Sequence, residues 1–393
     1  MKRFFCFIFL AAIAIALGFS QDLATYTYLY NGAETISDRL SILRQAEEAN
    51  LGDSEEFFAN ALSRLLTEYP NIQITLERNA ADATARFLAK VLGDKKYTAA
   101  GGNLWRLVEV FANPLVKADA LIALGRVGAV NYVPQILQTL HDLNARPALD
   151  REGGERIAYG AIVALENYQD LPEASRKEAA VMVYLASTGW YSDRVKNQAK
   201  ASLKNLAGDP AEPYVSVIRS SSYSYESKYQ ALQDLEAADA SASVKAGVAL
   251  DALAEGWRLP ANDMRVWATV TNIRKLAIRM INRYHTEDEA VYPLLERSYR
   301  YGTDTQEKLD TVAALASLST DKAVELLSSF LMIINGKLQS NNLRPDDQQM
   351  VRALIPAIGA TGNPQGRLVI NVVLSLNWNE AVKKLANDAL TRL

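Results

Sequence analysis

The stretch that decides the fold is Ala120-Leu-Ile-Ala-Leu-Gly-Arg-Val-Gly-Ala-Val-Asn-Tyr-Val-Pro-Gln-Ile-Leu-Gln-Thr-Leu140. Apolar residues on both sides of Gly125-Arg-Val-Gly128 recur with the spacing of a helix face. A glycine loop that binds phosphate follows a buried strand and, in its P-loop form, ends in Gly-Lys-Ser/Thr. Because neither feature is present, the sequence predicts a connection between two helices and not a ligand-binding loop.

The flanking residues predict where both helices begin and end. Asn113-Pro114 supplies a capping side chain and then a proline whose missing N–H has no helical partner in the first turn. Gly125 follows Leu124 at a place where a left-handed glycine would end the first helix. Pro134 falls in the first turn of the second helix, where proline is tolerated.

This pattern recurs at a period near 40 residues, which is typical of arrays built from two-helix units. Apolar or small pairs equivalent to Ala123-Leu124 are found at Ala164-Leu165, Ser202-Leu203, Met280-Ile281, Ala314-Leu315, Ala357-Ile358 and Ala389-Leu390. The position eight residues before the second member of each pair is apolar throughout, except that it holds Glu307 in one unit. The sequence therefore predicts an all-α fold, with a skipped unit between Leu203 and Ile281.

The run Val116-Lys-Ala-Asp-Ala-Leu-Ile-Ala-Leu-Gly-Arg-Val-Gly128, followed by Val133-Pro134, resembles the HEAT repeat of armadillo-type proteins, including the bacterial phycobilisome-lyase-type variety. This resemblance covers roughly residues 80–393 and implies a right-handed α-solenoid of antiparallel helix pairs. That family's basic residue after the first apolar position is matched by Lys117, Lys196, Arg274, Lys308 and Lys383, but its Asp six residues earlier is not matched. Tetratricopeptide arrays, whose period is about 34 residues, are the alternative.

Residues 1–20 have the layout of a secretory signal: Lys2 and Arg3, an apolar run, and then small residues around Phe19. We expect cleavage before Gln21, because the apolar run is shorter than the roughly 20 residues that a membrane span needs. A retained anchor is the alternative. We therefore expect secretion across the inner membrane of a bacterium, to the periplasm or beyond.

Cleavage would remove Cys6, the one cysteine of the chain. Disulfides and thiolate metal sites would then be excluded from the mature chain. Residues 21–80 carry helical apolar patterns and are expected to form an N-terminal cap or degenerate repeats, because terminal repeats must cover an apolar end. Residues 81–393 are expected to form the repeat array.

Charge and residue types narrow the classes of function. Removing residues 1–20 takes two of the 42 Lys and Arg and none of the 45 Asp and Glu, which leaves 40 − 45 = −5. This balance argues against a nucleic-acid partner. His141 and His285 are the only histidines, and no catalytic or metal-binding motif is found, so we expect no catalytic residue, metal or cofactor. The acidic turn Thr286-Glu-Asp-Glu289 is interpreted as solvated, with an ion site as the alternative.

The most basic helix predicted in the chain is Ile273-Arg-Lys-Leu-Ala-Ile-Arg-Met-Ile-Asn-Arg-Tyr284. Its apolar residues share one side, so its four basic residues are expected on the opposite, solvent-facing side. The next helix carries Tyr and Arg, which are frequent in interface hot spots. The predicted partner-binding residues are Arg274, Lys275, Arg279, Arg283, Tyr299, Arg300 and Tyr301. An ordinary solvated helix face is the alternative.

Together these features predict a non-catalytic scaffold that binds a protein or an extended peptide in the bacterial envelope. The oligomeric state stays open. One alternative is binding of cell-wall polymer or carbohydrate through Trp and Tyr, although Trp105 and Trp267 are expected in the core. Another is the lyase-like activity that the resemblance to bilin lyase subunits implies. Connections at 144–155, 220–227 and 335–347 are rich in turn residues and are further candidates for binding.

Export gives the first testable prediction. When the gene is expressed in its native host, the purified protein should begin at Gln21 and fractionate with periplasmic or secreted proteins. Mass spectrometry of the intact protein measures the N-terminus. A chain that retains Met1 and sediments with membranes would instead support the anchor.

Overall fold

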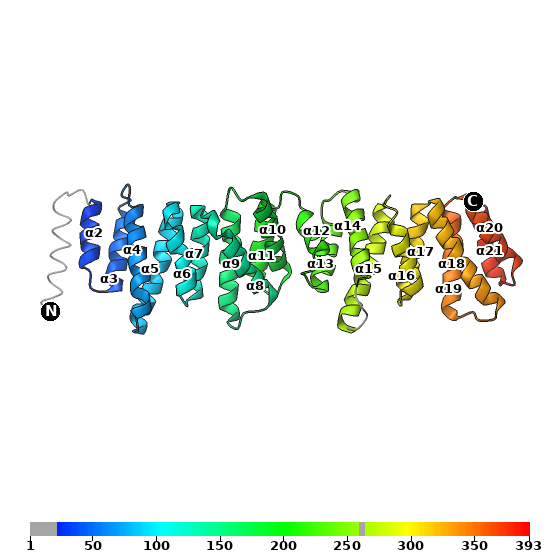
Figure 1. The fold of residues 1–393 in the computed structure, drawn as a ribbon, viewed down its shortest axis with the longest axis horizontal. Helices are drawn as coiled ribbons and strands as arrows, with labels where there is room; N and C mark the ends of the chain where they lie inside the picture. Colours follow the sequence, from blue (N-terminus) through cyan, green and yellow to red (C-terminus); the bar gives the residue numbers. More distant parts are fainter. Residues whose placement is uncertain (1–21, 259–263) are drawn as a thin grey trace. The chain divides into compact units, whose positions relative to one another are not determined.

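The computed structural model describes residues 22–258 and 264–393, and the predicted signal lies outside them. These residues form helices α2 to α21 with four short 3₁₀ helices and contain no strand, so the all-α prediction is confirmed (Figure 1). None of the helices in these two ranges combines the length and the apolar composition needed to cross a membrane. The chain divides into two compact units, the first ending at Ala207 and the second beginning at Gly208.

In unit 1 the odd-numbered helices pack in sequence, with α5 between α3 and α7 and α9 between α7 and α11. The even-numbered helices lie beside this odd row of unit 1, each packed on the odd-numbered helix that follows it. The helices are α2 (Leu23–Gly32), α3 (Ile36–Glu48), α4 (Glu55–Glu68), α5 (Thr75–Asp94), α6 (Gly101–Val110), α7 (Pro114–Val127), α8 (Val133–Ala145), α9 (Arg151–Asn167), α10 (Glu173–Thr188) and α11 (Asp193–Leu206).

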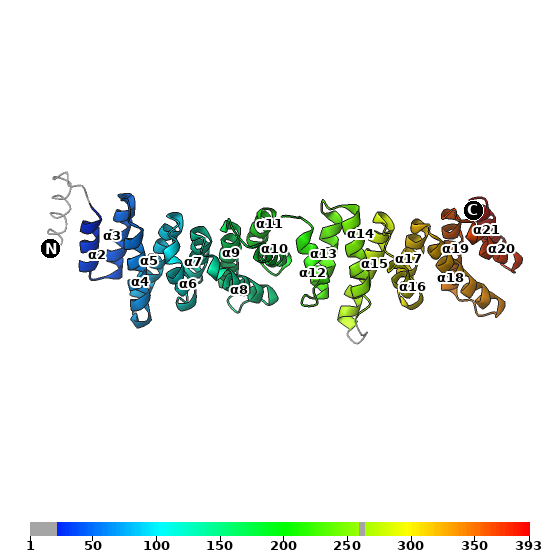
Figure 2. The ribbon, with the colours of Figure 1, turned by 45° about the horizontal axis from the view of Figure 1, so that its top comes forward.

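Unit 2 repeats this arrangement: its odd row runs from α13 through α15, α17 and α19 to α21, and each even-numbered helix packs on the odd-numbered one that follows. Figure 2 shows these pairs side by side from a second direction. The helices are α12 (Glu212–Arg219), α13 (Tyr225–Ala237), α14 (Ala242–Glu255), α15 (Met264–Tyr284), α16 (Val291–Tyr301), α17 (Thr305–Leu318), α18 (Asp321–Gln339), α19 (Pro345–Ala360), α20 (Arg367–Ser375) and α21 (Glu380–Leu390).

The recurring apolar pairs of the sequence all lie on odd-numbered helices: α7, α9, α11, α15, α17, α19 and α21. The period missed α13, whose fully buried pair Ala231-Leu232 comes 232 − 203 = 29 residues after Leu203. A unit of 39 residues counted from Leu203 would place the second residue of this pair ten residues beyond Leu232. The connections predicted at 335–347 and 144–155 are shorter in the structure, because α18 extends to Gln339 and α9 begins at Arg151.

The end of α7 differs from the prediction. The helix continues through Gly125 to Val127, and Gly128 is the left-handed residue, with φ of 70°. The N–H groups of Gly128 and Ala129 return to the carbonyls of Gly125 and Leu124, each at 3.2 Å. This hydrogen-bond pattern is the usual glycine-terminated helix end. The prediction that Gly125 ends the helix is therefore wrong.

Gly125 has a packing role, because α7 and α9 touch through their backbones. A Cβ atom on Gly125 would lie 2.7 Å from Cα of Ala164 on α9. A Cβ on Gly160 of α9 would likewise lie 2.7 Å from Cα and the carbonyl oxygen of Ala118 on α7. Real Cβ atoms do not approach so closely, so the two glycines set the separation of these helices.

The chain ends show how the rows finish. Near the N-terminus, α3 and α4 bury the apolar residues that the sequence indicated, namely Ile36, Leu40, Leu43, Phe57, Phe58, Ala61, Leu62, Leu65 and Leu66. The predicted boundary at 80–81 falls inside α5.

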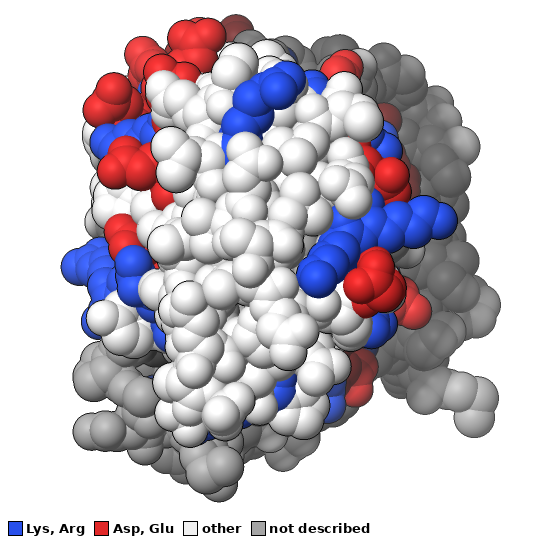
Figure 3. Space-filling view, turned by 90° about the vertical axis from the view of Figure 1, so that its right-hand side faces the viewer, with Lys and Arg blue, Asp and Glu red and all other residues white. Residues whose placement is uncertain are grey.

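At the C-terminal end, Figure 3 shows a broad surface without charged side chains, which are gathered at its rim. Residues 368–379, which cover α20 after its first residue and the connection to α21, include no charged residue.

Replacement of Gly125 by Ala tests the contact between α7 and α9. We expect a loss of about 1–3 kcal/mol in the free energy of unfolding, because the methyl group meets the backbone of Ala164. The control is Gly336→Ala, at a solvent-exposed position within α18, where a Cβ meets nothing within 4 Å. That change should stabilise by about 0.5–1 kcal/mol. Urea unfolding measures both, and a gain in stability for Gly125→Ala would contradict the packing role.

Candidate functional site

The predicted basic helix is α15, and its inward side is confirmed: Ile273, Leu276, Ala277, Met280 and Ile281 are all buried. Its opposite side differs from the prediction. Arg274 is only 3 % exposed and does not face water. It points to Glu307 of α17, which is fully buried and occupies the position that is apolar in the other units. The prediction that Arg274 is available to a partner is wrong, because its guanidinium is already enclosed.

The environment of Arg274 satisfies its charge. Nε and Nη2 donate to the two carboxylate oxygens of Glu307 at 2.7 and 3.0 Å, and Nη1 donates to the carbonyl of Gly256 at 3.1 Å. The guanidinium also lies over the ring of Trp257, 4.2 Å from its centroid. A buried charge is tolerated only when it is paired and hydrogen-bonded in this way. Arg274 thus joins α15 to α17 and to the end of α14.

The other three basic residues that the prediction places on α15 have carboxylate partners on α17, on its N-cap or on α13: Lys275–Asp304 at 2.7 Å, Arg279–Asp310 at 3.5 Å and Arg283–Glu236 at 3.2 Å. Lys275 is half-buried, whereas Arg279 and Arg283 are exposed. Each of the four basic residues of α15 from Arg274 to Arg283 therefore has one carboxylate partner, and this part of the helix presents little unbalanced charge.

The hydrogen bond from Lys275 holds the pKa of Asp304 below its usual value. A carboxylate whose pKa falls on folding stabilises the folded protein above its unfolded-state pKa, and this contribution is lost as the pH falls through the folded-state pKa. The pair between α15 and α17 is therefore expected to weaken in acid. Because both side chains are partly exposed, water screens the interaction.

The remaining predicted residues lie on α16, and Tyr299 and Arg300 contact Phe330 of α18. The Tyr299 ring stacks on Phe330 of α18 at 3.8 Å, and burial raises the pKa of Tyr299. Arg300 is exposed and pairs with Glu296 at 2.7 Å, and Tyr301 is 69 % exposed. The α15 residues contact α17 and α13, whereas Tyr299 contacts α18. The predicted site thus divides between two layers of unit 2.

One of these contacts recurs in unit 1. Asp310 lies five residues before Leu315, and Asp119 lies five residues before the equivalent Leu124. Asp310 accepts from Arg279 of the preceding odd-numbered helix, and Asp119 accepts from Arg86 at 2.6 Å in the same way. Ion pairs at this position connect successive odd-numbered helices in both units.

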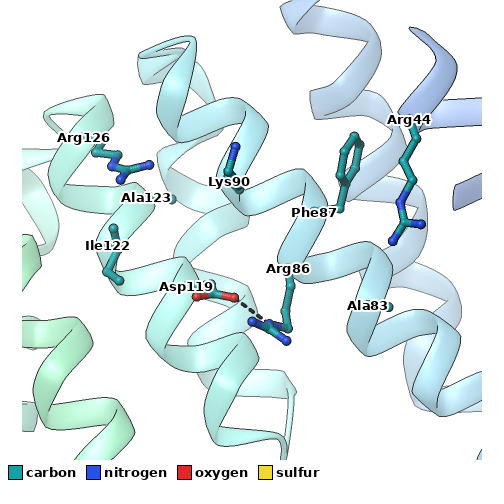
Figure 4. Close-up of a pocket in the computed structure, with 9 residues that line it drawn as sticks. All are labelled: Arg44, Ala83, Arg86, Phe87, Lys90, Asp119, Ile122, Ala123 and Arg126. Carbon is teal, nitrogen blue, oxygen red and sulfur yellow. Dashed lines mark hydrogen bonds and ion pairs between the residues drawn. The ribbon is translucent and has the colours of Figure 1, made fainter. Parts of the chain in front are cut away.

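The odd row of unit 1 also has a hollow of about 450 Å³ across α3, α5 and α7 (Figure 4). Helix α5 contributes residues 83, 86, 87 and 90, and α7 contributes residues 119, 122, 123 and 126, which is the spacing of one helix face. The lining residues are Arg44, Ala83, Arg86, Phe87, Lys90, Asp119, Ile122, Ala123 and Arg126. We call this feature the α3–α7 hollow.

Charge in the α3–α7 hollow is not balanced. Asp119 pairs with Arg86, and Asp94 is shared between Lys90, at 2.9 Å, and Arg126. Arg44 of α3 is exposed, and no carboxylate lies within 4 Å of it in the described part of the chain. Four cationic side chains therefore meet two carboxylates, a surplus of two positive charges. The basic residues of α15 from Arg274 to Arg283, by contrast, pair with one carboxylate each.

The sequence analysis missed the α3–α7 hollow because its cations are spread over three helices. A signal was available: Arg86 and Lys90 are four residues apart on α5, on the face that continues as Asp119 and Arg126 on α7. Recognising that face requires knowing that α3, α5 and α7 are neighbours in space. The spacing of basic residues along the chain instead favours α15 as the candidate site, because they are closest together there.

Other candidate positions carry less chemistry. Across residues 22–258 and 264–393 no group of three or more His, Cys, Asp or Glu could hold a metal ion. His285, beside the acidic turn, has φ of 58° at the end of α15. Trp105 is half-buried and stacks on Tyr132 at 5.7 Å, but Trp267 is 38 % exposed, so its prediction as a core residue is wrong.

The buried pair between α15 and α17 can be tested by removing charge in two ways. Glu307→Leu restores the apolar residue of the other units but leaves Arg274 buried without its carboxylate, and should destabilise by about 3–5 kcal/mol. Adding Arg274→Met removes that charge and should recover most of the loss. Asp251→Leu, at the exposed pair with Arg219 of α12, should change stability by less than about 1 kcal/mol. Urea unfolding measures all three, and an equal effect at both pairs would contradict the assignment.

Comparison of the chain with known protein families and with curated proteins finds no match. The function must therefore be argued from the side chains that the fold brings together. Among the described residues, the cationic surplus of the α3–α7 hollow is the feature that suggests a binding surface.

Proposed function

We propose that this protein is an exported α-solenoid of HEAT-like helix pairs, wound in the right-handed sense, that acts as a non-catalytic protein-binding scaffold in a bacterial envelope. Three observations support the proposal: the secretory layout of residues 1–20, the repeat pattern around Leu124, and the stacking of odd-numbered helices within each unit. Arrays of this kind bind through broad surfaces formed by successive repeats.

The observation that carries the proposal is the α3–α7 hollow. Three successive odd-numbered helices contribute to it, so the surface is already formed before a partner arrives. A preformed surface loses little conformational entropy on binding, which favours affinity. Arg44, which forms no ion pair with any residue in 22–258 or 264–393, supplies a charge that a ligand can neutralise without breaking a contact of the described structure.

The residues predicted from the sequence receive a different role in this proposal. Lys275, Arg279 and Arg283 connect α15 to its neighbours through ion pairs. A partner that bound them would have to displace those carboxylates. Electrostatic attraction of an acidic partner is therefore expected to be stronger at the α3–α7 hollow.

Affinity capture from an envelope extract of the native organism tests the scaffold function. The bait is the chain from Gln21 to Leu393, beside a variant with Arg44→Glu and Lys90→Glu in the hollow. The matched control carries Arg279→Glu and Arg283→Glu on α15. We expect mass spectrometry to identify a discrete protein that the unchanged chain and the control retain and that the hollow variant loses.

Each other outcome points elsewhere. A protein lost only by the α15 variant would return the site to the residues that the sequence predicted. Retention of wall polymer without protein would favour the carbohydrate-binding alternative. Circular dichroism of each bait, with an unchanged unfolding transition, confirms that a lost interaction reflects the altered surface and not an unfolded chain.

A further inference from the structure

We propose that the α3–α7 hollow binds an extended acidic segment of the partner protein, with an apolar side chain of that segment seated between α5 and α7. This inference rests on the proposed scaffold function and specifies the chemistry of its ligand. It follows from the charge, the floor and the span of the hollow.

The surplus charge defines the sign of the ligand. Within the part of the chain that the structure describes, two carboxylates for four cations leave Arg44 without an ion pair and leave Lys90 and Arg126 to share Asp94. A shared carboxylate satisfies each cation only in part, since it has two oxygens to offer both. Added carboxylates from a ligand would complete these pairs, and Arg favours such planar, two-oxygen acceptors.

The floor of the hollow defines a second requirement. Phe87 and Ile122 are half-buried, and Ala83 and Ala123 beside them are too small to fill the space. Figure 4 shows Phe87 and Ala83 on α5 and Ile122 and Ala123 on α7, with charged side chains around them. An apolar side chain placed there would be removed from water, and so would the surfaces of Phe87 and Ile122 that it contacts. This burial of apolar surface favours binding. The hollow therefore suits a ligand with acidic and apolar residues together.

The width of the hollow gives the length of the segment. Packed helices lie about 8–10 Å apart, so crossing from α3 over α5 to α7 spans about 20 Å. An extended chain advances about 3.3 Å per residue, so about six residues cover this distance. A helix rises only about 1.5 Å per residue and is too wide to bring successive side chains into the same hollow.

Charge elsewhere distinguishes an acidic peptide from a polyanion such as nucleic acid or polyphosphate. A polyanion gains affinity by neutralising many charges along a continuous basic stripe. The whole chain has a net charge of −3, and the four basic residues of α15 from Arg274 to Arg283 already pair with carboxylates. A short acidic segment can use the local surplus without extending over the acidic remainder of the surface.

The test uses an array of synthetic six-residue peptides in which Asp, Glu, Leu, Phe, Ser and Lys are varied at every position. The labelled chain from Gln21 to Leu393 should retain peptides that combine two or more acidic residues with Leu or Phe. The most strongly retained peptide is then measured in solution by fluorescence anisotropy, beside copies with Ser at its apolar positions. We expect Ser to weaken binding roughly fivefold or more, as for the loss of about 1 kcal/mol of apolar contact.

The matched variants are Arg44→Gln with Lys90→Gln in the hollow and Arg279→Gln with Arg283→Gln on α15. The first should weaken the peptide about tenfold, and the second should leave it unchanged. Polyphosphate provides the polyanion arm. The inference is overturned if no acidic peptide is retained, if Ser replaces the apolar residues without effect, or if polyphosphate binds as tightly as the peptide.

The two proposals fail in different ways. Capture of a discrete protein that hollow variants do not affect, with no acidic peptide on the array, would overturn this inference and leave the scaffold function in place. Binding of an acidic peptide to the hollow without any captured protein would overturn the scaffold function in the envelope, while the ligand chemistry would stand.

Discussion

The backbone contact between α7 and α9 is the constraint on which the rest of unit 1 depends. Gly125 and Gly160 allow each helix to rest against an alanine backbone of the other, Ala164 and Ala118. Because α5, α7 and α9 each pack between two odd-numbered neighbours, close contact requires small residues on their flanks, as at Gly125 and Gly160. Their larger side chains are then restricted to two directions: inward to the even-numbered helices, or outward. The outward direction is where the α3–α7 hollow forms.

In unit 2, successive odd-numbered helices are also held together by a charged pair, between α15 and α17. The pattern of the other units calls for an apolar residue at Glu307, and the fold accommodates the carboxylate by bringing Arg274 from α15 against it. The pair has further hydrogen bonds to Gly256 and Thr271, so little of its polar capacity is unsatisfied. Such a pair adds specificity to the contact between α15 and α17 more than it adds stability. It also removes Arg274 from the surface on which partners act.

Much of the fold could be predicted from the sequence because helices repeat with a fixed period. The spacing around Leu124 and the caps at Asn113 and Pro114 are local signals, and the structure has them where they were expected. The role of Gly125 could not be predicted, because it depends on Ala164 in the next repeat. The candidate site was harder still. Arg274 and Arg279 lie about 140° apart around the helix, and Arg274 falls between Ile278 and Ile281, which are both buried. The packing of α17 on that side encloses Arg274, whereas Arg279 stays exposed.

The buried pair of Arg274 and Glu307 has an evolutionary consequence. Either residue can return to an apolar side chain only through an intermediate that leaves the other charge enclosed and uncompensated. The two positions are therefore expected to change together in descendants of this sequence, since their effects on stability are strongly non-additive. The exposed positions 44 and 90 are under no such coupling. Single mutations can thus change which ligands the surface of unit 1 attracts. The contact between α15 and α17, in contrast, can change only when both residues of its buried pair change.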